Sequence, residues 1–155
     1  MTFHLHLDTE TVEQAYPWEP LTVRATDTVQ QAVDRLNEVG RGGILVVDDE
    51  GVLVGIFTER DALRMTATGE SFDTPVAEKM TSPVETVHVD DTVGTAIRHM
   101  STGGYRRMPM IDAAGKPVGV VSVGGILRYL VEHFPKIVYT LPPRPHHSTQ
   151  EREGA

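Results

Sequence analysis

The chain of 155 residues is 39% hydrophobic and 23% charged, which fits one compact domain or two small halves of a globular protein. Its formal net charge of −8 is the opposite of the positive footprint of a nucleic-acid-binding protein, so we expect no nucleic-acid partner. The chain contains no cysteine, which excludes disulfides, thiol catalysis and cysteine–zinc sites.

Residues 1–19 are expected to form an N-terminal arm, with four acidic residues and no lysine or arginine. The start of this arm lacks the basic residues and the apolar run of a signal peptide, and no segment approaches the roughly 20 apolar residues of a membrane helix. We therefore expect a cytoplasmic protein with no membrane partner. Tyr16 and Trp18 flank Pro17 and could anchor the arm either onto the rest of this chain or onto a partner subunit.

The main feature of the sequence is an internal repeat. Residues 23–64 reappear as residues 87–128, at a constant offset of 64 and with 12 identities in 42 positions. The repeat extends weakly upstream, because Val12 and Val76 are related by the same offset. Each copy alone, at about 60 residues, would be marginal as an independent fold, so the two copies are expected to pack together.

Each copy has the order strand, helix, strand, strand, helix. The strands of the first copy are expected at 21–24, 44–47 and 52–57. Its first helix has Thr26 or Asp27 as the N-cap and ends at Gly40, and its second helix runs from about 59 to 66. The second copy repeats this order, with a final helix from 125 to about Phe134.

A segment between the copies, with Thr74 as N-cap and Pro75 at the first helical position, predicts a short connector helix. The proline-rich end of the chain is expected to be partly disordered. The fold class is therefore α/β (α+β), with two β-α-β-β-α repeats packed with pseudo-two-fold symmetry. The expected division is an arm at 1–19, a first repeat at 20–72, a connector helix at 73–82, a second repeat at 83–135 and a tail at 136–155.

The turn from the last strand into the last helix of the first copy carries a candidate binding site. Thr58 offers a hydroxyl, and Asp61 lies one turn further on, where a carboxylate can accept hydrogen bonds from two ribose hydroxyls. Free backbone N–H groups at a helix start also suit a phosphate. The turn alone leaves a second interpretation equally open, in which Thr58 caps the helix and Asp61 complements its dipole.

The second copy differs from the first at two polar positions. It has Gly125 where the first copy has Asp61, and it has Arg106 and Arg107 where the first copy has two glycines. The arginines are placed for an anion, although arginine pairs are also common on solvated surfaces. The asymmetry predicts one composite site across both copies and a pseudo-symmetric partner site that is poor in ligand groups.

Three segments together resemble a known family: Asp-Thr-Val-x-x-Ala, Tyr-Arg-Arg-Met-Pro-Met-Ile-Asp and Gly-Ile-Phe-Thr-Glu-Arg-Asp. With them, residues 10–135 look like a tandem pair of cystathionine-β-synthase (CBS) domains. The resemblance implies a regulatory module that binds an adenosine nucleotide, AMP, ADP or ATP, in a cleft between the copies. It also implies a homodimer, and a module of this kind signals to a protein partner that the sequence does not identify.

The resemblance also implies roles for individual residues. Thr58 would bond ribose or phosphate, Asp61 would bond the ribose hydroxyls, and Arg106 and Arg107 would face the phosphates. The residues expected around the base are Ile56, Val84, Glu85, Thr86, Tyr105, Met108 and Pro109. Gly125 departs from the family pattern, so we expect one competent cleft and one weak or empty cleft.

Other kinds of site find little support in the sequence. His4 and His6 lack a third ligand at a suitable spacing, so no metal site is expected. The chain carries no nucleophile elbow, P-loop or HExxH motif, so we expect neither an enzyme nor a cofactor apart from the nucleotide ligand.

The apolar residues of the last helix could form core or a dimer face. The competing function is a ligand-free dimerisation scaffold with degenerate clefts, and a third is an enzyme's accessory subunit.

Overall fold

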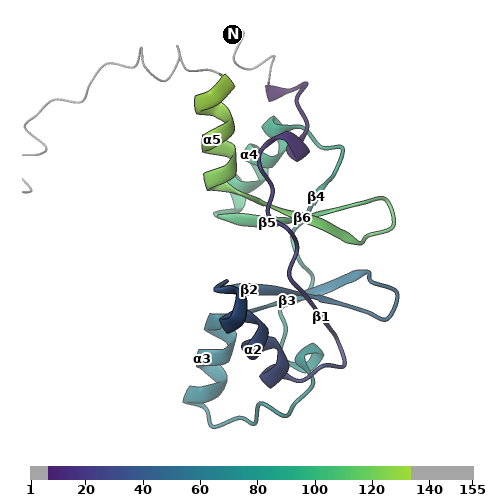
Figure 1. Ribbon diagram of the computed structural model, residues 1–155, viewed down its shortest axis with the longest axis vertical. Coiled ribbons are helices and arrows are strands. Elements are labelled where there is room, and N and C mark those ends of the chain that lie inside the picture. Colours follow the sequence, from purple (N-terminus) through teal and green to yellow (C-terminus); the bar gives the residue numbers. More distant parts are fainter. Residues whose placement is uncertain (1–6, 134–155) are drawn as a thin grey trace, which may run out of the picture.

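The computed structural model describes residues 7–133, which contain both repeats. The predictions for His4, His6, Phe134 and the tail at 136–155 lie outside these residues. Figure 1 shows the two repeats stacked along the long axis, with their sheets facing each other in the middle and most of the helices on the outer sides.

Both repeats have the predicted order of strands and helices. The first contains β1 (Thr22–Arg24), α2 (Val29–Val39), β2 (Gly43–Val47), β3 (Leu53–Thr58) and α3 (Glu59–Ala67). The second contains β4 (Val87–His88), α4 (Val93–Gly103), β5 (Arg107–Ile111), β6 (Pro117–Ser122) and α5 (Val123–His133). The mixed α/β fold class is therefore confirmed.

The two sheets have the same topology. In each, the first strand lies parallel to the second and the second lies antiparallel to the third, in the orders β1-β2-β3 and β4-β5-β6. Val23 pairs with Val46 in the first sheet, and their repeat counterparts Val87 and Met110 pair in the second. An irregularity in the strand register follows each of these partners, at equivalent positions of β2 and β5.

Two helices begin at other residues than those predicted. The N-cap of α2 is Thr28 and not Thr26 or Asp27, because its side chain and that of Gln31 form a reciprocal capping box. Asp27 instead accepts a hydrogen bond from the Arg24 backbone at 3.0 Å. Helix α5 begins at Val123 and not at 125, since the Ser122 hydroxyl accepts from the backbone N–H three residues on at 3.0 Å.

Where the sequence predicts a connector helix, the structure has a single 3₁₀ turn, η2 (Val76–Glu78). The Thr74 hydroxyl does not cap it but donates to the Ser71 carbonyl at 2.8 Å. A second 3₁₀ turn, η1 (Val12–Gln14), lies at the equivalent position of the N-terminal arm. The two turns are related by the same offset of 64 residues, so the repeat includes them.

The two 3₁₀ turns pack on opposite repeats. Turn η1, which precedes the first repeat in the chain, packs on the second, and turn η2, which precedes the second repeat, packs on the first. The Val12 N–H donates to the Asp91 carbonyl at 2.9 Å, and the Val76 N–H donates to the Asp27 carbonyl at 2.7 Å. Further along, Trp18 pairs with Val120 of β6, much as Thr81 pairs with Ile56 of β3. The arm therefore crosses to the second repeat before the chain enters the first, as Figure 1 shows.

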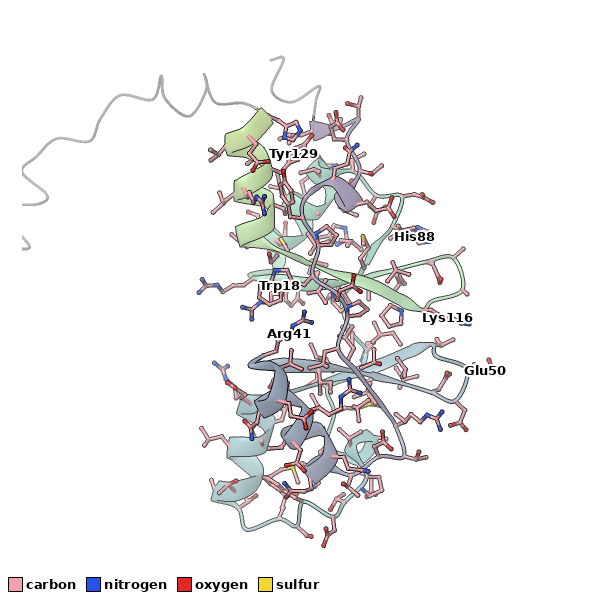
Figure 2. The ribbon with its side chains drawn as sticks, viewed as in Figure 1. Trp18, Arg41, Glu50, His88, Lys116 and Tyr129 are labelled. Carbon is pink, nitrogen blue, oxygen red and sulfur yellow. The ribbon has the colours of Figure 1, made fainter. Side chains whose placement is uncertain are left out.

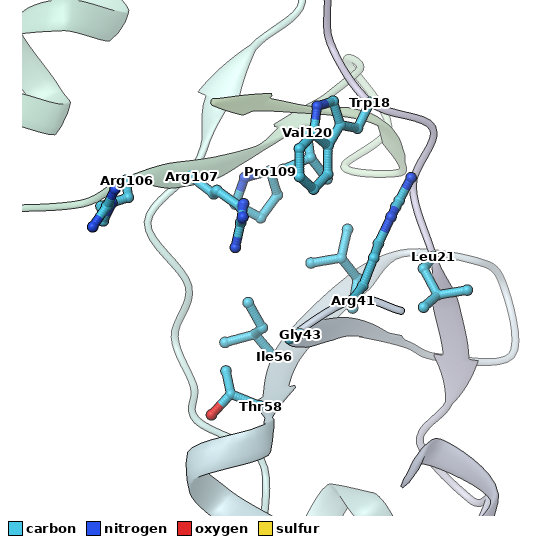
Figure 3. A pocket seen from close by; sticks show the side chains of 12 residues that line it. Trp18, Leu21, Arg41, Gly43, Ile56, Thr58, Arg106, Arg107, Pro109 and Val120 are labelled. Atoms are coloured by element: carbon cyan, nitrogen blue, oxygen red, sulfur yellow. The ribbon is translucent and has the colours of Figure 1, made fainter. Parts of the chain in front are cut away.

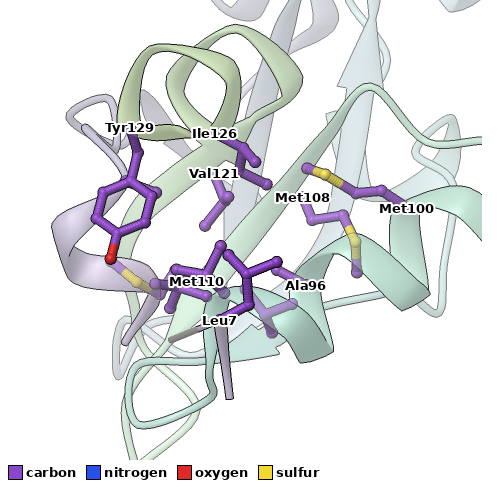
Figure 4. Packing of buried hydrophobic residues seen from close by; sticks show 12 residues of the cluster. Leu7, Ala96, Met100, Met108, Met110, Val121, Ile126 and Tyr129 are labelled. Carbon is purple, nitrogen blue, oxygen red and sulfur yellow. The ribbon is translucent and has the colours of Figure 1, made fainter. Parts of the chain in front are cut away.

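The hydrophobic core has two parts, one beneath each sheet, and the crossing segments contribute to both parts. Val12 is fully buried in the second-repeat core, and Val76 is fully buried in the first-repeat core. Figure 4 shows the second core, in which Met108, Met110 and Tyr129 surround the smaller side chains. The exchange of segments is reciprocal and follows the pseudo-two-fold symmetry of the two repeats.

The turns of the two hairpins also touch. The Leu53 N–H donates to the Gly115 carbonyl at 3.0 Å, which joins the β2–β3 hairpin to the β5–β6 hairpin. Glu50 and Lys116 lie at these neighbouring tips (Figure 2). One edge of the space between the sheets is therefore bridged by protein.

Candidate functional site

A cavity of about 230 Å³ lies between the two sheets. Its walls come from the arm, from the start of β2, from β3 and from the strands β5 and β6 (Figure 3). The residues that line it are Trp18, Leu21, Arg41, Gly42, Gly43, Leu45, Ile56, Thr58, Arg106, Arg107, Pro109 and Val120. The cavity thus combines an apolar surface with one hydroxyl and three guanidinium groups.

The Thr58 turn has the geometry of a helix cap. The Thr58 hydroxyl accepts from the Asp61 N–H at 3.3 Å, and the Asp61 carboxylate accepts from the Thr58 N–H at 2.9 Å. Asp61 is 8% exposed, does not line the cavity and has Arg64 at 3.5 Å. The capping interpretation is thus realised, while Thr58 itself also lines the cavity.

Three of the cavity residues are arginines that come from both repeats. Arg41 precedes β2, Arg106 directly precedes β5, and Arg107 is the first residue of β5. Within residues 7–133, none of the three forms an ion pair with a carboxylate. Their positive charge is therefore not neutralised by an ion pair in this part of the chain, although the overall charge of the protein is negative.

Trp18 lies between two of these arginines. The Arg107 guanidinium is 4.7 Å from the centroid of the indole, and that of Arg41 is 5.2 Å from it. Both distances fall in the range of cation–π interactions. The Arg41 side chain also donates a hydrogen bond to the Glu19 carbonyl.

The structure brings Ile56, Thr58, Arg106, Arg107 and Pro109 of the predicted site together around this cavity. The other predicted residues lie elsewhere. Met108 is 1% exposed in the core of the second repeat. Glu85 and Tyr105 line a second hollow beside α4, together with Arg98 and His99. Val84 and Thr86 are half-buried and do not line the cavity.

Seven cavity residues were not among those predicted from the sequence: Trp18, Leu21, Arg41, Gly42, Gly43, Leu45 and Val120. The repeat offset gives one signal, since Arg41 is the counterpart of Tyr105, a residue expected near the base. Trp18 carried the signal of an anchoring aromatic, and the structure shows that the arm is anchored on this chain. The contact between Trp18 and the two arginines depends on the crossing of the arm, which no local pattern indicates.

The turn of the second repeat is closed by the arm. A Cβ atom on Gly125 would overlap the Ala15 carbonyl oxygen and would lie 3.1 Å from that of Tyr16. Glycine at this position therefore lets the backbone of the arm lie against α5. An aspartate like Asp61 would collide with the arm.

Tyr16 fixes the arm to α5 through its side chain. Its hydroxyl donates to Glu132, and Arg128 lies 3.9 Å from its ring centroid and 3.1 Å from the Glu132 carboxylate. The hydrogen bond from Tyr16 lowers the pKa of the Glu132 carboxyl, and the same bond raises the pKa of the Tyr16 hydroxyl. Tyr16 adopts φ 52°, in the left-handed region.

Within residues 7–133 no three side chains of histidine, aspartate or glutamate gather as metal ligands. None of the helices in that range has the length and apolar character needed to cross a bilayer.

Comparisons with a family model, with related sequences and with solved structures all point to the same protein family. The CBS domain model matches residues 12–67 and 76–132, two ranges that begin at equivalent positions of the repeat. A 17.7 kDa protein of Acidianus ambivalens is 32% identical over 121 residues, which are 78% of this chain and 73% of that protein. The CBS domain-containing protein YhcV of Bacillus subtilis is 35% identical over 106 residues, covering 68% of this chain and 74% of YhcV.

Among solved structures, the CBS domain pair of protein MJ0100 superposes with a TM-score of 0.66 at 27% identity, over 76% of this chain and 97% of that one. That structure is a complex with 5′-methylthioadenosine and S-adenosyl-L-methionine. The matched ranges cover both repeats and include the two 3₁₀ turns that cross between them. The chain therefore belongs to the CBS domain family, as a tandem pair of CBS domains.

Proposed function

We propose that this protein is a regulatory module that binds an adenosine nucleotide, AMP, ADP or ATP, in the cavity between its repeats. The observation that carries the proposal is the composition of the cavity. Apolar side chains such as Ile56, Pro109 and Val120 suit a purine base, and the arginines suit phosphate. Both repeats contribute, so a ligand there contacts both.

The comparison with MJ0100 supports the adenosine part of the ligand, because both compounds in that complex contain adenosine. The charge of this cavity favours a phosphate over a sulfonium. Its three guanidinium groups, which pair with no carboxylate in the described part of the chain, repel a cation and attract an anion. A nucleotide therefore fits this chain better than S-adenosylmethionine does.

For the ribose, the proposal keeps Thr58 and Asp61. Thr58 lines the cavity, and Asp61 lies behind it in the first turn of α3. One carboxylate oxygen of Asp61 is used by the cap, and the other faces Arg64 at 3.5 Å. A ribose hydroxyl can bond this second oxygen if Arg64, which is exposed, turns outward.

The proposed mechanism is a population shift and not catalysis. A ligand that contacts both repeats favours the relative orientation in which all of its contacts form, by the difference in its affinity for the two arrangements. The protein would pass this orientation on to a partner. Cytoplasmic location is part of the same proposal, since adenosine nucleotides are its ligands.

The partner surface proposed here is the outer face of α3 and α5, and its first occupant is a second copy of the chain. Leu63 and Leu127 occupy equivalent positions of the two repeats and are 72% and 55% exposed. Val131 extends this face on α5 at 43% exposure. Both helices lie on the same side of the molecule (Figure 1). A homodimer would cover these side chains.

The proposal is tested by thermal unfolding of the full chain with AMP, ADP, ATP and S-adenosylmethionine. A ligand at 100 times its dissociation constant stabilises the fold by about 2.7 kcal/mol, which raises the melting temperature by several degrees. We expect a saturable shift with the nucleotides. The variants Arg107→Gln and Asp61→Asn should reduce it, and Asp61→Asn keeps an acceptor for the helix cap.

Lys116→Gln is the matched control, because it removes one positive charge at a hairpin tip outside the cavity. It should leave the shift unchanged. If no nucleotide shifts the melting temperature, the ligand-free scaffold becomes the better function. The closed turn at Gly125 and the exposed leucines are the observations that favour that alternative.

A further inference from the structure

A hollow on the second repeat, the α4–α5 groove, presents apolar side chains to solvent. Its volume is about 280 Å³, and the exposed side chains of Tyr105, Val123 and Leu127 line it. No residue that lines it carries a charge, and none of them lines the cavity between the sheets. Its lining also includes Ile97 and Ser101 of α4 and Ile126 and Leu130 of α5.

The equivalent surface of the first repeat is more polar. At the offset of 64, the counterparts of Tyr105, Val123, Ile126 and Leu130 are Arg41, Glu59, Ala62 and Thr66. By contrast, Leu127 keeps a leucine, Leu63, as its counterpart. A partner that contacts both repeats alike would favour the same kind of residue in both. The α4–α5 groove therefore fits an apolar occupant that meets only the second repeat.

The chain itself continues from one wall of this groove. Helix α5 ends at His133, one turn beyond Leu130, and residues 134–155 follow it outside the described residues. The first eight of them, Phe-Pro-Lys-Ile-Val-Tyr-Thr-Leu, contain five large apolar residues and a single charge, Lys136. The residues after them are rich in proline and charge. An apolar segment thus follows directly on an apolar groove.

This segment is long enough to reach the whole groove. From Leu130 to Val123 the groove extends for about 10 Å along α5, at the rise of an α-helix. An extended chain covers about 3.3 Å per residue, so roughly three residues span this length. Residues 134–141 can therefore turn at the end of α5 and still lie along the groove.

The path that the chain takes after the first repeat is closed to this segment. After α3 the chain returns to the start of α2, where the Val29 N–H donates to the Thr74 carbonyl at 2.9 Å. At the equivalent place in the second repeat, the Val93 N–H donates to the Glu10 carbonyl at 2.8 Å. Glu10 belongs to the arm and lies 64 residues before Thr74. The arm thus occupies this path, and the chain after α5 needs another.

We propose that residues 134–141 turn back at Pro135 and pack their apolar side chains in the α4–α5 groove of the same chain. Proline disfavours a helical conformation in the residue before it, so the chain that leaves α5 changes direction here. Burial of apolar surface on both the segment and the groove drives the packing. The proposal is independent of nucleotide binding, since the groove and the cavity share no residue. Leu127 also belongs to the proposed homodimer face, so a second copy is the competing occupant.

Paramagnetic broadening in NMR spectra of the full chain tests this packing. The chain has no cysteine, so Gly124→Cys gives a single site for a nitroxide label beside the groove. Gly124 is exposed, does not line the groove, and an added Cβ there meets nothing closer than 3.9 Å. Because the segment would run back toward the start of α5, we expect the amide signals of residues 138–141 to lose more intensity than those of 134–135.

Matched variants show whether the broadening comes from the groove. Arg60→Cys places the label at the equivalent exposed position of the first repeat and should leave the signals of residues 138–141 at full intensity. In the Gly124→Cys chain, Ile137→Asp with Val138→Asp adds two charges to the apolar segment and should restore those signals. Ser148→Asp with Thr149→Asp adds the same charge beyond the segment and should leave the broadening as it is.

A mixture of two preparations separates the same chain from a second copy. One carries the label at Gly124→Cys without ¹⁵N, and the other carries ¹⁵N without the label. Broadening of residues 138–141 in this mixture would place the segment on a second copy and overturn the proposal. An intensity loss that declines steadily from residue 134 onward in the labelled chain, or equal losses with the Arg60→Cys label, would show that the segment does not occupy the groove. Each of these results leaves the thermal-shift test of the nucleotide site unaffected.

Discussion

Gly125 shows how one residue can serve packing where its repeat counterpart serves a polar role. Asp61 caps α3 in the first repeat, and the equivalent position of the second repeat has no side chain at all. The carbonyl oxygens of Ala15 and Tyr16 occupy the space that a side chain would fill. The departure from the family pattern thus has a steric cause in this chain.

This cause predicts that Gly125→Ala destabilises the protein by about 1–3 kcal/mol, because its Cβ would overlap a backbone oxygen of the arm. Gly124→Ala is the control in the same helix, since its Cβ would meet nothing closer than 3.9 Å. Alanine there should be neutral or stabilising by up to about 1 kcal/mol. Urea unfolding measures both, and equal stabilities of the two variants would contradict the steric explanation.

Other single residues could be foreseen only in part. The sequence indicates Thr58, Arg106 and Arg107, because hydroxyls and arginines at turns are recognisable ligand groups, and all three line the cavity. Met108, which the resemblance puts near the base, instead lies in the core of the second repeat, because its side chain is on the face of β5 that packs inward. Arg41 could not be ranked above other arginines without knowing where Trp18 lies.

At the scale of the elements, the outer face of α3 and α5 exposes large apolar side chains to solvent. The sequence leaves open whether the apolar residues of the last helix form core or a dimer face, and in the structure some of them are buried and others exposed. Leu130 packs against the core cluster, whereas Leu127 and Val131 remain exposed. Leu63 repeats the exposure on α3.

If a second copy covers this face, charge placed on it will separate the subunits. We expect the double variant Leu63→Glu and Leu127→Glu to have the mass of one chain in light scattering coupled to gel filtration, and the wild type the mass of two. Because both side chains are exposed in the single chain, the variant should keep the wild-type circular dichroism. A wild-type protein with the mass of one chain would refute the homodimer.

The regular elements are predictable because they obey local rules. Alternating apolar residues, turn residues and capping threonines mark them, and the constant repeat offset lets each copy check the other. Helix starts shift by one or two residues, since Thr28 competes with Thr26 and Asp27 for the same cap. The connector is one 3₁₀ turn, Val76–Glu78, and its first residue is buried in the core of the first repeat.

For the whole molecule, the exchanged segments mean that neither repeat has a complete core of its own. Leu7, Val12 and Ala15 belong to the core of the second repeat, although they precede the first in the chain. Val76 belongs to the core of the first. The two halves therefore depend on each other for burial of apolar surface, beyond the contacts of their sheets.

We expect one cooperative unfolding transition in calorimetry, with equal calorimetric and van't Hoff enthalpies. Val12→Ala and Val76→Ala remove equivalent, fully buried methyl groups, and each should lower the stability of this single transition by about 1–3 kcal/mol. Val12→Ala acts on the second core and Val76→Ala on the first. Two separate transitions in either variant would show that the repeats unfold independently.

We expect the contact between the hairpin tips to act as a hinge when the spacing of the two repeats changes. The bond from Leu53 to Gly115 joins the repeats at one edge of the gap, while α3 and α5 lie at the opposite edge (Figure 1). A rocking motion that preserves this bond displaces the atoms near the tips least and those of the two helices most. Because α3 and α5 are further from the hairpin tips than the cavity is, a small change in the width of the cavity would produce a larger change in the spacing of Leu63 and Leu127.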